Sequence, residues 1–176
     1  MTAPFASGQA LSDLILGYQH TAFRLEQRDD RYSDPEEDEP FRRFLAGEPA
    51  TVTGWNDEWE EMLRRRTADG QRMTRVRIVA EPHTDYTRFL LDLARINVPA
   101  GEDIRYLSRD RAKDLDLPHE DFWLIDSAKV AIMRFAEDNT LLGADVTDDP
   151  AVVVKHCYYR DVASHYAIPY REYVGS

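Results

Sequence analysis

Three side chains that could bind a ligand or take part in hydrolysis occur at alternate positions: Glu81, His83 and Asp85. They follow an apolar, β-branched segment typical of a buried strand, and α/β domains often place binding groups beyond the ends of strands. A histidine between carboxylates could also hold a metal ion. In the alternative interpretation, Asp85 caps a helix, and the other two residues are solvated or form ion pairs.

A second polar pair, Asp103 and Arg105, follows the next expected helix. Together with Glu102, the two groups could line a shared cleft at the carboxyl ends of the strands, where a small ligand could bind. The sequence predicts neither a resident metal nor a cofactor at this place.

A histidine and an aspartate stand seven positions apart, at His119 and Asp126. This spacing resembles the His-x-Lys-x-x-x-x-Asp motif of phospholipase D-type enzymes, in which the histidine is the nucleophile or general acid and the lysine holds the phosphate. Here Asp121 occupies the lysine position, and Lys129, across the following turn, does not have the motif's spacing. A carboxylate beside a phosphate reverses the electrostatics that stabilise the transition state, so we expect no catalysis.

Two other interpretations of these residues stay open. An enzyme that uses His119 and Asp126 would need a homodimer, because the chain carries a single candidate motif and the enzymes use two. In the structural interpretation, His119 is a loop residue and Asp126 holds a tight turn through side-chain hydrogen bonds.

Hydrophobic periodicity predicts the elements that must position these residues. Strands are expected at 22–26, 73–79, 104–107, 122–125, 130–135 and 141–146, and helices near 11–15 and at 37–45, 55–67, 85–97, 109–115 and 150–165. One crossover helix between parallel strands, followed by hairpins, indicates an α/β fold with a mixed, partly parallel sheet flanked by helices. The order is similar to a phospholipase D-like half-domain. We expect residues 1–70 to form an acidic N-terminal helical and strand region packed on an α/β core of residues 71–176, the two making one structural unit.

Composition excludes several classes of function. The 176 residues carry a net charge of −11, which disfavours direct binding to nucleic acid or to an anionic membrane. Cys157 is the only cysteine, so no internal disulfide and no cysteine-rich zinc site can form. The sequence shows no secretory signal and no apolar run of membrane-spanning length, so we expect a cytoplasmic protein.

Most of the net negative charge lies in one segment, residues 26–61, which has 13 acidic and 4 basic side chains. Within it, the acidic run from Asp29 to Glu39 is either a solvated loop or a docking surface for a basic partner. The candidate docking residues are Asp30, Asp34, Glu36, Glu37, Asp38 and Glu39. The arginines at 64–66 adjoin glutamates at helical spacing, so we expect ion pairs there rather than nucleic-acid contacts.

Segments 23–26, 75–86, 100–105 and 117–126 resemble an actinobacterial family of unknown function whose genes commonly lie near helix-turn-helix regulators. The resemblance covers nearly the whole chain and implies a regulatory context. Together with the missing lysine and the acidic segment, it leads to our main hypothesis. We hypothesise that the protein is a non-enzymatic accessory protein that binds a protein partner, a helix-turn-helix transcription regulator. The alternatives are a divergent phosphodiesterase or hydrolase and a small-ligand sensor.

Overall fold

The structure, a computed structural model, describes residues 4–31, 35–52 and 54–175. Its strands are β1 (Phe5–Ala6), β2 (Thr21–Glu26), β3 (Arg72–Val79), β4 (Glu102–Ser108), β5 (Phe122–Ile125), β6 (Lys129–Phe135), β7 (Leu141–Thr147) and β8 (Ile168–Pro169). Its helices are α1 (Gly8–Leu16), α2 (Pro35–Leu45), the 3-10 turn η1 (Ala50–Val52), α3 (Asp57–Ala68), α4 (Asp85–Ala100), α5 (Arg109–Ala112), α6 (Pro150–Tyr166) and α7 (Tyr170–Tyr173).

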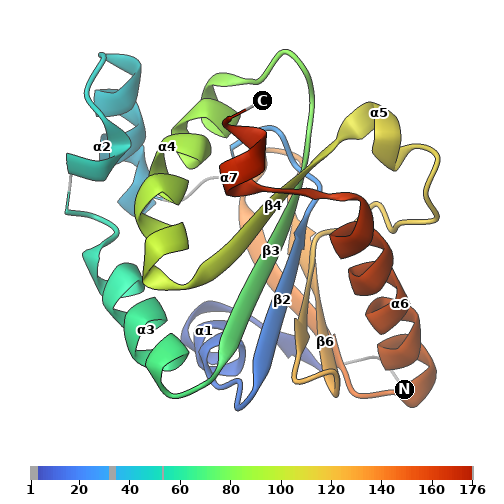
Figure 1. The fold of residues 1–176 in the computed structure, drawn as a ribbon. Coiled ribbons are helices and arrows are strands. Elements are labelled where there is room, and N and C mark those ends of the chain that lie inside the picture. The colour runs from blue at the N-terminus through green and yellow to red at the C-terminus, as the bar shows by residue number, and fades with distance from the viewer. Residues whose placement is uncertain (1–3, 32–34, 53, 176) are drawn as a thin grey trace.

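All these strands join one sheet in the order β1-β7-β6-β5-β2-β3-β4-β8 (Figure 1). Strands β2, β3 and β4 are parallel, and α4 is the crossover between β3 and β4. Strand β5 pairs antiparallel with β2, the hairpins add β6 and β7, and the short strands β1 and β8 pair at the two edges. The expected α/β fold with a mixed, partly parallel sheet is therefore confirmed.

Strand β2 lies in the middle of this sheet, between β5 and β3. Residues Ala22 to Leu25 are all buried, because they send side chains toward both helical layers. Residues 1–70 therefore do not simply pack on a core formed by residues 71–176. The N-terminal region supplies a central strand of the core itself.

Helix ends follow local capping chemistry. The hydroxyl of Thr84 accepts a hydrogen bond from the backbone N–H of Thr87 at the start of α4, and Asp149 caps α6 in the same way. Helix α4 continues three residues beyond the expected end, because Gly101 rather than Pro99 ends the helix. Gly101 has a φ of 122°, and its N–H bonds to carbonyls of the last turn.

Helices cover both faces of the sheet (Figure 1). Helices α1 and α3 pack on side chains such as Ala22 and Trp123, whereas α6 packs on Phe23 and Leu25 from the opposite side. This division follows from the alternation of side chains along a strand, which sends neighbours such as Ala22 and Phe23 to opposite faces. Helices α2 and α4 pack together through an aromatic cluster around Phe89.

Within the part of the chain that the structure describes, no helix has the length and apolar character needed to cross a membrane.

A charged cavity as the candidate functional site

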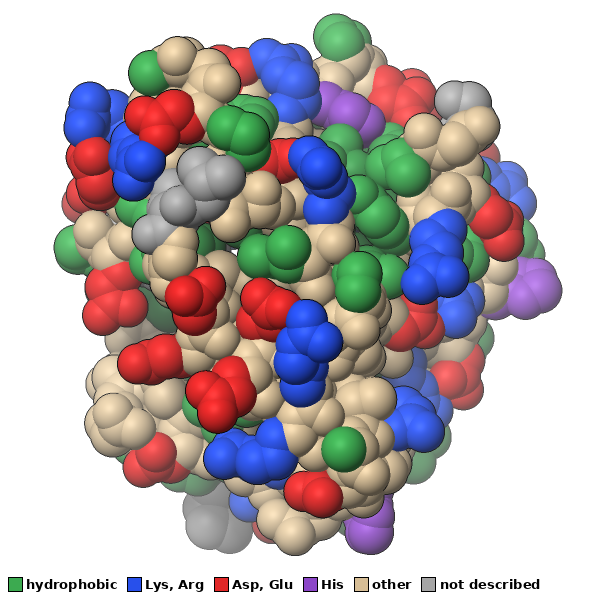
Figure 2. Space-filling view, turned by 60° about the vertical axis from the view of Figure 1, so that its left-hand side comes forward, with side chains coloured by type: hydrophobic (Ala, Val, Ile, Leu, Met, Phe, Trp, Pro, Cys, Tyr) green, Lys and Arg blue, Asp and Glu red, His purple; other side chains and the backbone are tan. Residues whose placement is uncertain are grey.

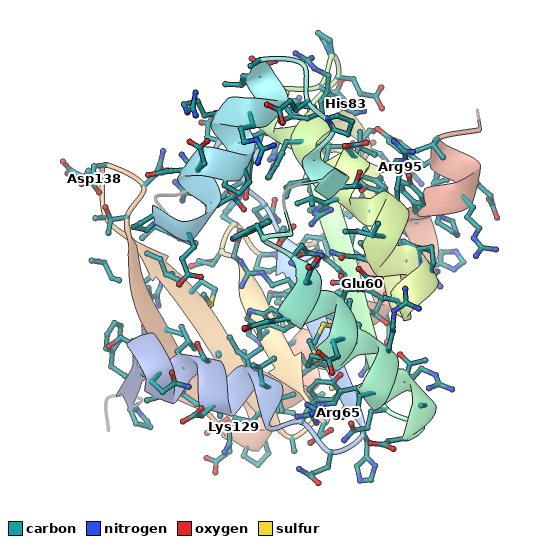
Figure 3. The ribbon with its side chains drawn as sticks, turned by 90° about the vertical axis from the view of Figure 1, so that its left-hand side faces the viewer. Glu60, Arg65, His83, Arg95, Lys129 and Asp138 are labelled. Carbon is teal, nitrogen blue, oxygen red and sulfur yellow. The ribbon has the colours of Figure 1, made fainter. Side chains whose placement is uncertain are left out.

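A cavity of about 630 Å³ lies between the sheet and the layer formed by α1 to α4. Figure 3 looks onto this side of the molecule and shows the four helices arranged around the underlying strands. The lining residues come from every one of these helices and from strands β2, β3, β5, β6 and β7. A site assembled from so many separate segments exists only in the folded chain.

The floor of the cavity is charged. Arg24 and Glu26 on β2 stand beside Arg75 and Arg77 on β3, because the parallel register pairs Arg24 with Arg75 and Glu26 with Arg77. Residues two apart on a strand share a face, so all four side chains point into the same layer. A buried sheet face normally carries apolar side chains, so this charged patch calls for a specific explanation.

Ion pairs connect the floor residues into one network. The Nε of Arg77 donates to Glu26 at 2.7 Å, and Nη1 of Arg75 also donates to Glu26. The Nε of Arg75 donates to Glu102, from β4, at 2.6 Å. Glu102 is 1% exposed, so this carboxylate depends entirely on its protein partners for stabilisation.

The network controls the ionisation of Glu26. Burial opposes the charged form, but the guanidinium groups of Arg75, Arg77 and Arg24 outweigh it and hold the pKa of Glu26 well below its usual range. Glu26 is therefore a carboxylate under all physiological conditions, and it serves as the shared anion of the network.

Arg24 is the least satisfied member of the network. It is 5% exposed, and its Nη2 donates to Asp121 at 3.1 Å. Its Nε has no hydrogen-bond partner, and the nearest described carboxylate oxygen, on Glu26, is 3.8 Å away. Buried donors of this kind are rare in folded proteins.

Aromatic side chains hold the guanidinium groups in place. The Cζ of Arg24 lies 5.3 Å from the ring centroid of Trp123, and the Cζ of Arg75 lies 5.5 Å from it and 6.0 Å from the ring of Trp59. Cation–π contacts leave the edge of a guanidinium group available for hydrogen bonds. Trp55 also lines the cavity, so all three tryptophans of the protein border it.

The phospholipase D-like motif residues do not converge on one point. His119 is exposed and precedes β5, whereas Asp126 follows β5 at the other end of that strand. Asp126 accepts hydrogen bonds from the backbone N–H groups of Gln19, His20 and Thr21 at 2.7–2.9 Å. Its role is to hold the segment that enters β2.

Asp121, at the lysine position of the motif, has a matching role at the other end of β2. Besides pairing with Arg24, it accepts a hydrogen bond from the backbone N–H of Gln27 at 2.8 Å. Burial raises the pKa of Asp121, and Arg24 opposes this effect only in part. Because β2 and β5 are antiparallel, the two aspartates of the motif fix both ends of β2.

The structure does not bring the expected ligand-binding residues into a shared cleft. Glu81, His83 and Asp85 lie beyond the end of β3, whereas Asp103 lies at the beginning of β4, opposite Thr74. In a pair of parallel strands, the residues at the start of one strand lie at the opposite end of the sheet from the residues that follow the other strand. His83 appears at the end of the molecule opposite Arg65 and Lys129 in Figure 3.

These residues are instead engaged in local contacts. The two ring nitrogens of His83 contact the carbonyl of Ala80 and the hydroxyl of Tyr173, each at 2.9 Å. Asp85 pairs with Arg88, and Arg105 pairs with Asp103 on the same strand. No group of three histidine, cysteine or acidic residues suited to a metal ion occurs in the described ranges.

Much of the acidic segment forms ion pairs within itself. Arg31 pairs with the buried Glu37 and with Asp38, and Arg42 pairs with Glu39. Figure 2 shows acidic and basic side chains interspersed on the side of the molecule that carries α2 and α3. Asp30 and Glu36 are exposed, and Asp34 lies outside the described residues.

Sequence reasoning did not single out the cavity floor. The signal was present as charged residues at alternate positions of two strands, Arg24 and Glu26 in one and Arg75 and Arg77 in the other. Alternation places such residues on one face, but only the register of β2 against β3 places the two faces side by side.

Comparison with known proteins agrees with this architecture. Among solved structures, NucT from Helicobacter pylori superimposes with a TM-score of 0.51 at 14% identity, covering 90% of this chain and 87% of NucT. At this identity the likeness shows the fold alone, which is phospholipase D-like. No curated protein matches the sequence. The family described as "Domain of unknown function (DUF6879)" matches residues 9–175, nearly the whole chain, and the protein therefore belongs to that family.

Proposed function

We propose that this protein is a non-enzymatic sensor that binds a small organic molecule in the charged cavity. The observation that carries the proposal is Arg24, a buried guanidinium with an unpartnered Nε beside a cavity of about 630 Å³. A buried donor without an acceptor costs about 1–3 kcal/mol, and a ligand with acceptor atoms would recover part of that cost. The volume falls within the range of small-molecule sites, about 300–1,000 Å³.

A hydrolytic role has less support. A carboxylate, Asp121, stands where a phosphodiesterase needs a lysine, and it is already paired with Arg24. The exposed His119 has no described partner carboxylate or base that would orient it. Activity screens compare the wild type with two variants. His119→Ala tests the divergent phosphodiesterase, and His83→Ala tests the hydrolase. Turnover by the wild type that either substitution abolishes would overturn the non-enzymatic assignment.

Helix α2 offers a connection between the cavity and a protein partner. Glu36 and Glu37 line the cavity, whereas the side chains of Asp38 and Glu39 on the same helix are 62% and 60% exposed. A ligand that shifts α2 would alter the acidic surface that a partner contacts. On this basis we propose that the protein acts in the cytoplasm on a helix-turn-helix regulator, in keeping with its resemblance to actinobacterial proteins encoded near such regulators.

Thermal-shift and tryptophan-fluorescence screens with a chemically diverse metabolite panel test the binding function. A ligand at 100 times its dissociation constant should stabilise the protein by about 2.7 kcal/mol, which corresponds to a rise in Tm of about 5–10 °C. Ser12→Phe, at an exposed residue that borders the cavity, should block binding. Gln9→Phe, on the same helix but outside the lining, should not. If the panel contains no ligand whose binding Ser12→Phe blocks, the proposal is wrong.

The partner hypothesis has its own test. The purified regulator encoded beside this protein should bind it with an affinity that changes when a cavity ligand is added. Glu39→Lys should weaken this binding, whereas Glu61→Lys, at an exposed position on α3, should leave it unchanged. Equal binding by both variants would count against docking through α2.

A further inference from the structure

The cavity has two chemically distinct parts. Its floor carries the guanidinium groups of Arg24, Arg75 and Arg77, and its walls carry apolar and aromatic side chains from three helices and the outer strands. The wall residues include Leu11, Ile15, Trp59, Met62, Leu90 and Phe135. A molecule that satisfies both parts has a polar head rich in hydrogen-bond acceptors and an apolar body.

We propose that the ligand is a small organic acid, whose carboxylate contacts the guanidinium of Arg24 and whose apolar body lies between α1 and α3. This inference rests on the proposed ligand-binding function and specifies the chemical class of the ligand.

The donors of the floor select a carboxylate. A guanidinium has five N–H donors and no acceptor, and the hydrogen bond from Nη2 to Asp121 is the one described for the Arg24 side chain. Arg75 and Arg77 each have a carboxylate within 2.7 Å, whereas Arg24 Nε has none closer than 3.8 Å. The planar oxygens of a carboxylate match the fork geometry of a guanidinium.

The surrounding charge selects a monoanion. The three arginines of the floor face three carboxylates, Glu26, Glu102 and Asp121, so the network has little net charge to offer a polyanion. Glu58 is exposed where it borders the cavity, and it repels a second negative charge on an entering molecule.

Matched pairs of probes test the head group. Phenylacetate, 4-phenylbutyrate and octanoate are titrated against their primary amides and against phenyl phosphate, with tryptophan fluorescence and calorimetry as readouts. None of these probes fluoresces as tryptophan does, and all three tryptophans line the cavity. We expect at least one acid to bind about tenfold more tightly than its amide, and phenyl phosphate to bind more weakly than phenylacetate.

Two substitutions with opposite expected effects separate binding from folding. Arg24→Lys keeps the charge but loses the fork, and should weaken acid binding by about tenfold. Asp121→Asn keeps the acceptor for the Gln27 N–H but removes the competing anion, and should tighten acid binding. Arg105→Lys, on strand β4 and paired with Asp103 outside the cavity, is the matched control and should change nothing.

The outcomes distinguish this inference from the proposed function. Acids and amides that bind equally well, or acid binding that Arg24→Lys leaves intact, would overturn the carboxylate while leaving a ligand-binding cavity in place. Tighter binding of phenyl phosphate than of phenylacetate would also overturn it. If none of the probes binds, the carboxylate inference is wrong. The broad metabolite panel with Ser12→Phe then decides independently whether the cavity binds any ligand.

Discussion

Nη2 of Arg24 donates to Oδ2 of Asp121 at 3.1 Å, and both residues are 5% exposed. This pair joins strand β2 to the residue that precedes β5. The motif's cationic position is therefore occupied by an anion, and the cation at this place comes from the adjacent strand. Arg24 and Asp121 therefore form an internal ion pair, while the neighbouring cavity keeps guanidinium donors.

The pair predicts that Asp121 is important for stability. Asp121→Ala leaves a buried guanidinium without its anion and the Gln27 N–H without its acceptor, so we expect a loss of about 3–5 kcal/mol in the free energy of unfolding. Asp121→Asn should lose less, because the amide oxygen can still accept from Gln27. Urea denaturation of the wild type and both variants measures these differences. Equal stability of the alanine variant and the wild type would show that the pair contributes nothing.

Asp126 predicts a different effect, confined to backbone anchoring. Asp126→Ala removes the acceptor for three backbone N–H groups at the start of β2, and we expect a loss of about 1–3 kcal/mol in the free energy of unfolding. Asp148→Ala, at an exposed aspartate ahead of α6, should change stability by less than about 0.5 kcal/mol. Ligand binding in the cavity should survive Asp126→Ala, so that a loss of binding without a loss of stability would contradict this role.

Glu26 predicts the acid sensitivity of the protein. Its pKa in the folded protein lies below its ordinary value of 4.5, because Arg75, Arg77 and Arg24 outweigh the effect of burial. The folded state therefore binds fewer protons at Glu26 than the unfolded state, so this contribution is full above pH 4.5 and decreases as the pH falls below it. The effect of Asp121 on stability has the opposite sign, because its pKa is raised in the folded protein. Its contribution to the free energy of unfolding decreases as the pH rises through that raised pKa.

Thermal unfolding between pH 3 and pH 7 measures this dependence. Glu26→Gln should be less stable than the wild type at pH 7 and should lose less additional stability on acidification, because it has no proton to bind. Glu61→Gln, at an exposed position on α3, should follow the wild-type curve. If the Tm of the wild type and that of Glu26→Gln fall equally steeply with decreasing pH, the groups that cause the acid sensitivity lie elsewhere.

The sequence by itself determined the succession of elements. The apolar run at 122–125 becomes β5, and the alternation at 73–79 becomes β3; the structure then shows Thr84, rather than Asp85, as the cap of α4. These features depend on short-range chemistry, namely side-chain alternation, capping hydrogen bonds and the conformational limits of glycine and proline. The chain therefore indicates the mixed α/β fold without any tertiary information.

Tertiary structure alone decided which charged residues meet. Arg24 lies 51 positions before its neighbour Arg75 and 97 positions before its partner Asp121, and nothing in the local pattern connects them. The polar side chains at 81–85 looked more suited to binding, but the direction of the parallel strands sends Asp103 to the other end of the sheet. Strand order and register are set by the packing of the whole core, so a site built across β2, β3 and β5 exists only after those strands have paired.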